Sequence, residues 1–179
     1  MKYQTVIAGF GGQGSVFLVK VLALCAGNRD LKFLGTENHG MSQRGGAVSC
    51  DIKIGEFSNP VIDRGQADLL IGLDANEALR NLQLLKEGGH VASNAQEPFP
   101  EGLPFQVHTI DANAKALAGE FPIQGLNVFM LGVTLASVPD FPFSIEEIEK
   151  ALRQINAKVA EQNIEVLHHA IADAKGIEN

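Results

Sequence analysis

The chain has 179 residues, of which 45% are hydrophobic, and a formal net charge of −7. This length and apolar content favour a single domain spanning residues 1–179 with a substantial core. The acidic balance, without a cluster of Lys and Arg, argues against nucleic-acid binding, because neutralising phosphates needs grouped basic side chains. No apolar run approaches the roughly 20 residues of a membrane helix, and the first residues do not read as a signal peptide, so we expect a cytoplasmic protein with no membrane contact.

Hydrophobic periodicity divides the chain into alternating strands and helices. In chain order, we expect strands over 5–8, 31–37, 47–54, 67–74, 90–94 and 105–110. We expect helices over 16–27, 75–86, 112–118, 126–138, 144–155 and 156–176. Alternation of this kind predicts an α/β fold in which helices cover both faces of a mostly parallel, mixed sheet. The expected fold class is therefore a three-layer α/β/α Rossmann-like domain.

Individual residues refine several of these elements. Residues 47–54 alternate apolar and polar side chains, which predicts a half-exposed strand suited to antiparallel pairing. Asp74 is placed to cap the helix that follows it, and the Gly88-Gly89 pair to end that helix. Ser144 begins a capping-box pattern at the start of a helix, and we expect Gly176 to end the last one.

A glycine turn lies between the first strand and the first helix. Gly9, Gly11 and Gly14 satisfy the pattern G-x-G-x-x-G, in which glycines permit a sharp bend, close approach of a phosphate and tight packing of helix on strand. One interpretation is a dinucleotide site, with Glu37 as the acidic residue at the end of the second strand. Against it, Gln13 places an amide side chain at the tip of the turn. Another interpretation is a purely structural turn that needs glycine for positive φ.

A second glycine-rich loop, residues 37–46, has no apolar periodicity. Arg44 is followed by two glycines, so a planar fork of donors would lie beside exposed backbone N–H groups, an arrangement suited to an anion. His39 can titrate near neutral pH, and Glu37 can hold either His39 or Arg44. The alternative is a solvated loop with a local Glu–Arg pair worth less than about 1 kcal/mol. Such a loop is more typical of a site than of a connector.

The cysteines and histidines do not predict a metal centre. Cys25 and Cys50 are far from any C-x-x-C pattern, and an iron–sulfur cluster normally takes four cysteines, so we expect two buried, hydrophobic side chains. His90, His108 and the adjacent pair in the last helix lack metal-ligand spacing. We therefore expect that this chain binds no metal.

Taken together, the motifs resemble those of a known family. The chain contains Gly9-Phe-Gly-Gly-Gln-Gly14, then Glu37-x-His39-Gly-Met-x-Gln43-Arg44-Gly-Gly46, then Asn127-x-x-x-Leu-Gly132 and a last helix with Asn163. This combination is similar to the gamma-subunit family of 2-oxoacid:ferredoxin oxidoreductases, the pyruvate, ketoisovalerate and 2-oxoglutarate type. The resemblance covers almost the whole chain. Its motif wording is most similar to the small (beta) subunit of the indolepyruvate enzymes.

The resemblance implies a subunit of a complex that oxidatively decarboxylates a 2-oxoacid to an acyl-CoA and reduces ferredoxin. Alpha- and beta-type catalytic subunits would carry thiamine diphosphate and the iron–sulfur clusters, and this chain would have no catalytic residue and no activity alone. It would help to bind coenzyme A. The residues assigned to that site are Gly9, Gly11, Gly12, Gln13, Gly14, Arg44, Gly45 and Gly46. The residues assigned to an interface or a supporting role are Glu37, His39, Gln43 and Asn127.

We expect the glycine turn and the second loop to lie side by side at the carboxyl end of the sheet, where open α/β folds place their sites. Two alternatives stay open. One is a stand-alone Rossmann oxidoreductase that binds NAD(P) or a flavin dinucleotide. The other is a homodimer in which Arg44 and its glycines form the interface between two copies.

Overall fold

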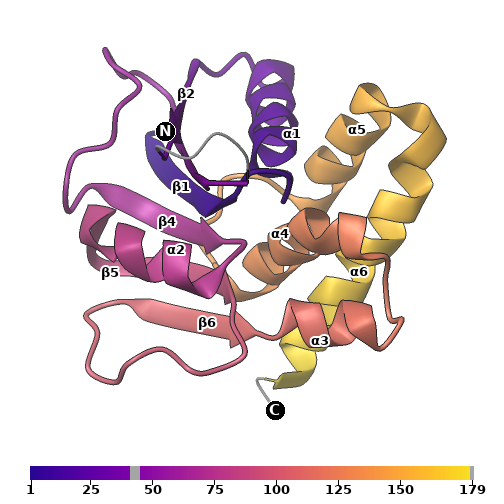
Figure 1. Ribbon diagram of the computed structural model, residues 1–179. Helices are drawn as coiled ribbons and strands as arrows, with labels where there is room; N and C mark the ends of the chain where they lie inside the picture. Colours follow the sequence, from indigo (N-terminus) through magenta and orange to yellow (C-terminus); the bar gives the residue numbers. More distant parts are fainter. Residues whose placement is uncertain (41–44, 178–179) are drawn as a thin grey trace.

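The computed structural model describes residues 1–40 and 45–177, and its elements alternate much as the sequence predicts (Figure 1). The described strands are β1 (Tyr3–Phe10), β2 (Phe33–His39), β3 (Ala47–Ile54), β4 (Ala67–Gly72), β5 (Leu85–Asn94) and β6 (Gln106–Ile110). The described helices are α1 (Ser15–Asn28), α2 (Ala75–Asn81), α3 (Ala112–Leu117), α4 (Leu126–Ser137), α5 (Ile145–Ile155) and α6 (Ala157–Ile177), with short 3-10 turns η1 (Leu82–Leu84) and η2 (Ile123–Gly125).

The strands form one mixed sheet in the order β2-β3-β1-β4-β5-β6. β1, β4, β5 and β6 are parallel, whereas β3 is antiparallel to both of its neighbours, β1 and β2. The glycine turn follows β1, so it leaves the sheet at the carboxyl edge of the parallel strands. The predicted mixed, mostly parallel sheet is confirmed.

Alternate side chains of the central strands face two different cores. Ile7, Leu69 and Ile71 pack in the larger core with α1 and α4, and α5 and α6 pack behind these helices (Figure 1). Val6 and Leu70 face the opposite way, into a smaller cluster beside α2. Hydrophobic stabilisation follows the apolar area that is buried, so most of it comes from the face covered by α1 and α4.

β3 is more buried than its alternating sequence predicts. Asp51 and Lys53 are only 4% and 5% exposed. The segment after β3 supplies their partners, because Ile62 N donates to Asp51 Oδ2 (2.9 Å) and Lys53 Nζ donates to Asn59 Oδ1 (3.3 Å). Burial raises the pKa of Asp51 above its usual value. The antiparallel pairing is confirmed, but the predicted half-exposed strand is wrong, since polar side chains can be buried where a neighbouring loop satisfies them.

The helix after β4 is shorter than predicted. Asp74 caps it as expected, but α2 ends at Asn81 and η1 follows. β5 then begins at Leu85 and contains both Gly88 and Gly89, so these glycines do not end a helix. A Cβ on Gly89 would lie 3.0 to 3.3 Å from three backbone oxygens. Glycine is needed there because another part of the backbone approaches closely, which is a common reason for glycine within a strand.

Two further helix ends test the sequence patterns. Ser144 forms the predicted capping box with Glu147, since Ser144 N donates to Glu147 Oε2 (2.8 Å) and Glu147 N donates to Ser144 Oγ (3.4 Å). α6 continues through Gly176 to Ile177, so the predicted stop is wrong. One glycine weakens a helix by only about 1 kcal/mol, which a long helix tolerates. Over the described residues, no helix combines the length and the apolarity needed to cross a membrane.

Candidate functional site

The glycine turn joins the carboxyl end of β1 to α1. Gly12 and Gly14 have φ values of +92° and +89°, in the left-handed region that residues with a Cβ rarely adopt. Gly14 is the N-cap of α1, and a glycine has no side chain with which to cap the helix. The first turn of α1 therefore keeps backbone N–H groups of the kind that bind anions.

The side chain of Gln13 folds back into its own turn. Its Oε1 accepts a hydrogen bond from Phe10 N (2.7 Å), and its Nε2 donates to the carbonyl oxygen of Leu73, just after β4 (3.4 Å). Gly9 makes room for this arrangement, because a Cβ there would lie 2.6 Å from Gln13 Oε1. Both ends of the carboxamide are thus engaged within the chain.

Two buried asparagines support the turn from other elements. Asn94, at the end of β5, donates from Nδ2 to Leu73 O (3.1 Å) and accepts from Ala112 N (3.0 Å) at the start of α3. Asn127, in the first turn of α4, donates from Nδ2 to Gly14 O (3.2 Å). A Cβ on Gly14 would overlap the Asn127 carboxamide. Sequence analysis selected Asn127 but missed Asn94, whose only signal is a polar residue at the carboxyl end of a buried strand.

The end of the loop between β2 and β3, Gly45 and Gly46, lies beside the glycine turn. Gly11 N donates to Gly46 O (2.9 Å), and a Cβ on Gly11 would lie 3.7 Å from Gly45 Cα. The two glycine motifs therefore meet at the carboxyl edge of the sheet, as the sequence predicts. Gln43 and Arg44 lie outside the described residues, so the anion-binding role expected of Arg44 stays a prediction.

Glu37 and His39 lie on the edge strand β2, away from β1. Glu37 Oε2 and His39 Nε2 are 3.2 Å apart, and both side chains are exposed. Glu37 pairs across the sheet with Cys50 of β3, which separates it from β1. A dinucleotide-binding fold places its second strand directly beside the first, so that the acidic residue reaches the ribose. The strand order here removes the structural context that this interpretation of Glu37 requires.

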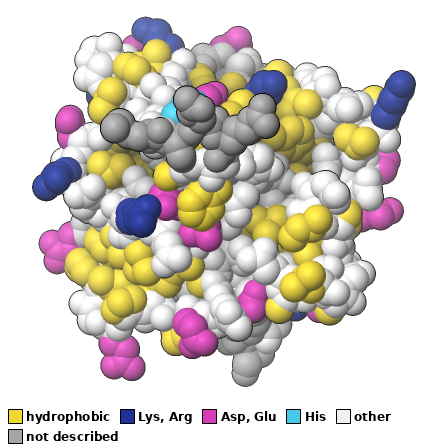
Figure 2. Space-filling view, viewed as in Figure 1, with side chains coloured by type: hydrophobic (Ala, Val, Ile, Leu, Met, Phe, Trp, Pro, Cys, Tyr) yellow, Lys and Arg dark blue, Asp and Glu magenta, His cyan; other side chains and the backbone are white. Residues whose placement is uncertain are grey.

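An open cavity borders the turn beside α3 and η2, and a second one adjoins it at Asn113. The first, about 290 Å³, is lined by Gly12, Gln13, Asn113, Ile123, Gln124 and Leu126. The second, about 400 Å³, is lined by Asp74, Ala75, Asn76, Asn94, Ala95, Gln96, Asp111, Asn113, Ala114 and Leu117. No described Lys or Arg lines either cavity. Hydrophobic side chains reach the surface here (Figure 2), where Leu117 is 87% and Ile123 51% exposed.

Comparison with known proteins identifies the family. The profile of the family described as Pyruvate ferredoxin/flavodoxin oxidoreductase matches residues 4–172. The chain belongs to this family. Two curated relatives are indolepyruvate oxidoreductase subunits IorB. The one from Methanothermobacter thermautotrophicus is 31% identical and covers 86% of this chain and 87% of the relative. The one from Archaeoglobus fulgidus is 29% identical, and the match covers 93% of this chain and 92% of the relative.

Solved structures of ferredoxin oxidoreductases that act on 2-oxoacids have the same fold. The gamma subunit of a keto/oxoacid ferredoxin oxidoreductase from Geobacter sulfurreducens gives a TM-score of 0.78 at 23% identity, covering 97% of this chain and 99% of that chain. A 2-oxoglutarate:ferredoxin oxidoreductase from Magnetococcus marinus gives a TM-score of 0.79 at 18% identity, covering 98% of this chain and 31% of that chain. The likeness confirms the Rossmann-like fold class.

The predicted assignment to small subunits of 2-oxoacid:ferredoxin oxidoreductases is confirmed, and the chain is an oxidoreductase subunit of this class. The alternative of a stand-alone NAD(P) or flavin enzyme finds no support in these comparisons. The strand order of the sheet agrees, because it separates Glu37 from the glycine turn.

Both cysteines of this family member are buried, as predicted. Burial raises the pKa of Cys25 to about 12 and that of Cys50 to about 11. The Cys25 thiol donates to the carbonyl oxygen of Glu147 (3.5 Å). An iron–sulfur cluster normally takes four Cys thiolates, so two thiols whose pKa values are raised do not make up a ligand set for a cluster.

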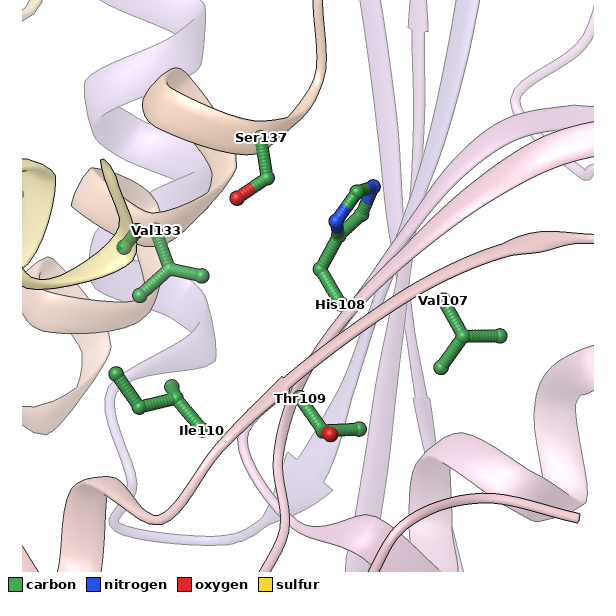
Figure 3. A pocket seen from close by; sticks show the side chains of 7 residues that line it. Val107, His108, Thr109, Ile110, Val133 and Ser137 are labelled. Atoms are coloured by element: carbon green, nitrogen blue, oxygen red, sulfur yellow. The ribbon is translucent and has the colours of Figure 1, made fainter. Parts of the chain in front are cut away.

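A third cavity lies away from the turn, beside the edge strand β6. Its volume is about 230 Å³, and it is lined by Val107, His108, Thr109, Ile110, Val133, Ser137 and Ala174. Figure 3 shows Val133 and Ser137 of α4 across this space from Ile110 and His108 of β6. The residues selected from the sequence as site candidates do not line this cavity.

One group of potential metal ligands was missed by the spacing argument. Glu120, His169 and Asp173 bring their ligand-type atoms within 4.8 Å of one another. His169 and Asp173 are four positions apart on α6, but Glu120 comes from the segment between α3 and η2, a separation that sequence spacing does not reveal. Lys115 Nζ lies 2.9 Å from Asp173 Oδ2, so a side-chain cation already pairs with this group.

Proposed function

We propose that this chain is the non-catalytic small subunit of a complex that converts a 2-oxoacid and coenzyme A to an acyl-CoA and carbon dioxide. The two electrons released pass to ferredoxin. Partner subunits of alpha and beta type hold thiamine diphosphate and the iron–sulfur clusters. The observation that carries this proposal is the family match over residues 4–172 in a chain whose only two cysteines are buried and hard to ionise.

The role of the chain within the complex is to help bind coenzyme A at the turn formed by Gly9–Gly14 and the adjoining Gly45–Gly46. The uncapped start of α1 supports this role, since phosphates bind at helix N-termini. The hydrogen bond between Gly11 and Gly46 brings both motifs to one place. The related Magnetococcus marinus enzyme is described with coenzyme A bound. Arg44 would add a bidentate grip on a phosphate.

The substrate we propose is an aryl 2-oxoacid of the indolepyruvate type. The support is the name of the curated relatives, which are indolepyruvate oxidoreductase subunits. The substrate pocket would lie on the partner subunits, because the cavities near the turn are open rather than enclosed within an apolar core. In this arrangement the chain determines coenzyme A binding and its partners determine which 2-oxoacid reacts.

Co-production of this chain with its thiamine diphosphate-binding partner tests the proposed function. The purified complex should reduce methyl viologen when supplied with indolepyruvate and coenzyme A, and the chain alone should not. Omission of coenzyme A should stop turnover. A chain that purifies without a partner, or that changes NADH fluorescence on titration, would contradict the proposal. Arg44→Ala should raise the KM for coenzyme A in the complex, whereas Arg44→Lys should recover part of the affinity.

A further inference from the structure

Gln13 has a role that differs from that of a ligand contact. We propose that Gln13 is a positioning residue, whose carboxamide fixes the conformation in which the turn presents its backbone N–H groups to coenzyme A. This inference rests on the proposed function of the turn. It changes the assignment of Gln13 from a residue that binds the cofactor to one that holds the residues that do.

Two hydrogen bonds join Gln13 to Phe10. Gln13 N donates to Phe10 O (3.1 Å), and Phe10 N donates to Gln13 Oε1 (2.7 Å). The backbone and the side chain of one residue thus both bond to the residue at the start of the turn. The turn is closed at this end by Gln13 itself, and the absence of a Cβ on Gly9 leaves the space that this requires.

The turn is also attached to the neighbouring strand, at the residue that follows β4. Gln13 Nε2 donates to Leu73 O (3.4 Å), and Asn94 Nδ2 donates to the same oxygen (3.1 Å). Leu73 N in turn donates to Ala8 O (2.8 Å). The carboxyl ends of β1, β4 and β5 are therefore joined through the backbone N–H and carbonyl groups of Leu73, with Gln13 as the connection to the turn.

The two ends of the turn are held by side chains, whereas its middle is exposed. Gln13 holds its start, and Asn127 holds its end through Gly14 O (3.2 Å). Gly11 and Gly12, between these points, are exposed. Gly11 N is already bonded to Gly46 O. A ligand can therefore approach the backbone N–H at Gly12, while the side chain of Gln13 stays engaged within its own turn. A preorganised backbone lowers the ordering cost of binding.

Two substitutions separate the contributions of Gln13. Gln13→Glu keeps an acceptor for Phe10 N but replaces the donor to Leu73 O by a carboxylate oxygen. Gln13→Met keeps a similar length and loses both bonds. The matched control is Gln83→Glu, which makes the same chemical change at an exposed position of η1, before β5 and hence at the opposite edge of the sheet.

The kinetic test uses the reconstituted complex and compares the KM for coenzyme A with kcat. Both Gln13 variants should raise the KM for coenzyme A about tenfold while kcat and the KM for the 2-oxoacid change less than about twofold, because only the cofactor-binding backbone is loosened. A result equal to that of Gln83→Glu would overturn the proposal. So would a parallel loss of kcat and of both KM values, since that describes a general structural defect.

Hydrogen exchange of the full chain gives a readout that does not depend on coenzyme A. Exchange at the Phe10 amide should be about tenfold faster in Gln13→Met than in Gln83→Glu, because the bond to Oε1 is lost. Unchanged exchange would overturn the positioning role whatever the kinetics. If exchange rises but the wild-type complex needs no coenzyme A, the positioning of the turn stands and the proposed function of the turn is wrong.

Discussion

The backbone N–H of Gly11 donates a 2.9 Å hydrogen bond to the carbonyl oxygen of Gly46, and this bond joins the two glycine motifs of the chain. It depends on the antiparallel direction of β3, whose first residue, Ala47, pairs with Phe10 at the end of β1. A parallel β3 would begin at the opposite edge of the sheet. The reversed strand therefore brings Gly45 and Gly46 to the proposed site.

The two left-handed glycines of the turn should differ in their tolerance of alanine. A Cβ on Gly12 meets nothing within 4 Å, so Gly12→Ala should cost only the backbone strain of positive φ, about 1 to 2 kcal/mol. Gly14→Ala adds overlap with Asn127 and should cost about 3 kcal/mol or more. Urea unfolding of both variants measures the difference. Equal destabilisation would contradict the role of Asn127 as the neighbour that requires glycine.

Replacement of Asn94 by aspartate should be strongly destabilising. Asn94 is 4% exposed, and its Nδ2 donates to Leu73 O. An aspartate loses this donor and brings a buried negative charge beside a carbonyl oxygen, which should cost about 3 kcal/mol of unfolding free energy. The control is Asn76→Asp, an exposed position in the first turn of α2, where a negative charge is favourable. Similar midpoints for both variants in urea would argue against the hydrogen-bond arrangement around Leu73.

The buried carboxyl of Asp51 should impose a pH dependence on stability. Burial raises the pKa of Asp51 in the folded protein above its ordinary value of 3.8, so the folded state binds this proton more tightly than the unfolded state does. The contribution of Asp51 to stability is then greatest below pH 3.8 and declines as the pH rises through the folded-state pKa. Asn at this position can still accept from Ile62 N and has no such decline.

Asp51→Asn should therefore gain stability relative to the wild type as the pH rises from 3.8, until the difference levels off above the folded-state pKa. Chemical unfolding at a series of pH values measures this difference. Asp63→Asn, at an exposed position of the following segment, serves as the control for loss of one negative charge. A stability difference between Asp51→Asn and the wild type that is the same at every pH would show that burial of the charge is not its cause.

Leu117 should contribute to assembly rather than to folding. Its side chain is 87% exposed and borders a cavity near the turn. Leu117→Glu should change the unfolding free energy by less than about 0.5 kcal/mol but weaken the complex with the catalytic subunits about tenfold or more, as expected for a lost apolar contact. Val159→Glu, at a 40% exposed position of α6, is the control. Analytical ultracentrifugation of the mixed subunits decides, and equal assembly of both variants would place the contact elsewhere.

The sequence predicted the parts of the site that depend on local geometry. The glycine turn was found because a strand, a turn and a helix start each have short-range signals, and Asn127 was selected through the family resemblance. The roles of Gln13 and Asn94 were not predicted, because both side chains bond to the carbonyl oxygen of Leu73. That residue is 60 positions away from Gln13 and 21 positions away from Asn94. The residues around a Gln or Asn in the sequence do not show whether its carboxamide binds a ligand or a distant backbone group.

The same limit applies to the elements that were predicted less well. The alternation of β3 is real, but Asp51 is covered by the segment that contains Ile62, and alternation cannot show which loop folds over a strand. The residues after α2 favour a helix as well as a strand, and pairing of Leu85 with Ala67 of β4 decides for the strand. Tertiary contacts overrule local preference at both places.

The central place of β1 in the sheet affects how the chain folds during synthesis. β1 ends at Phe10 and pairs with β3 and β4. Residues up to Gly72 must therefore emerge from the ribosome before both edges of β1 can be covered. At translation rates of about 5 to 20 residues per second, the nascent strand waits for several seconds. During this interval its apolar residues are open to chaperones and to other nascent chains. The strand that is made first is thus among the first at risk of aggregation, and its glycine turn takes shape only after its neighbours arrive.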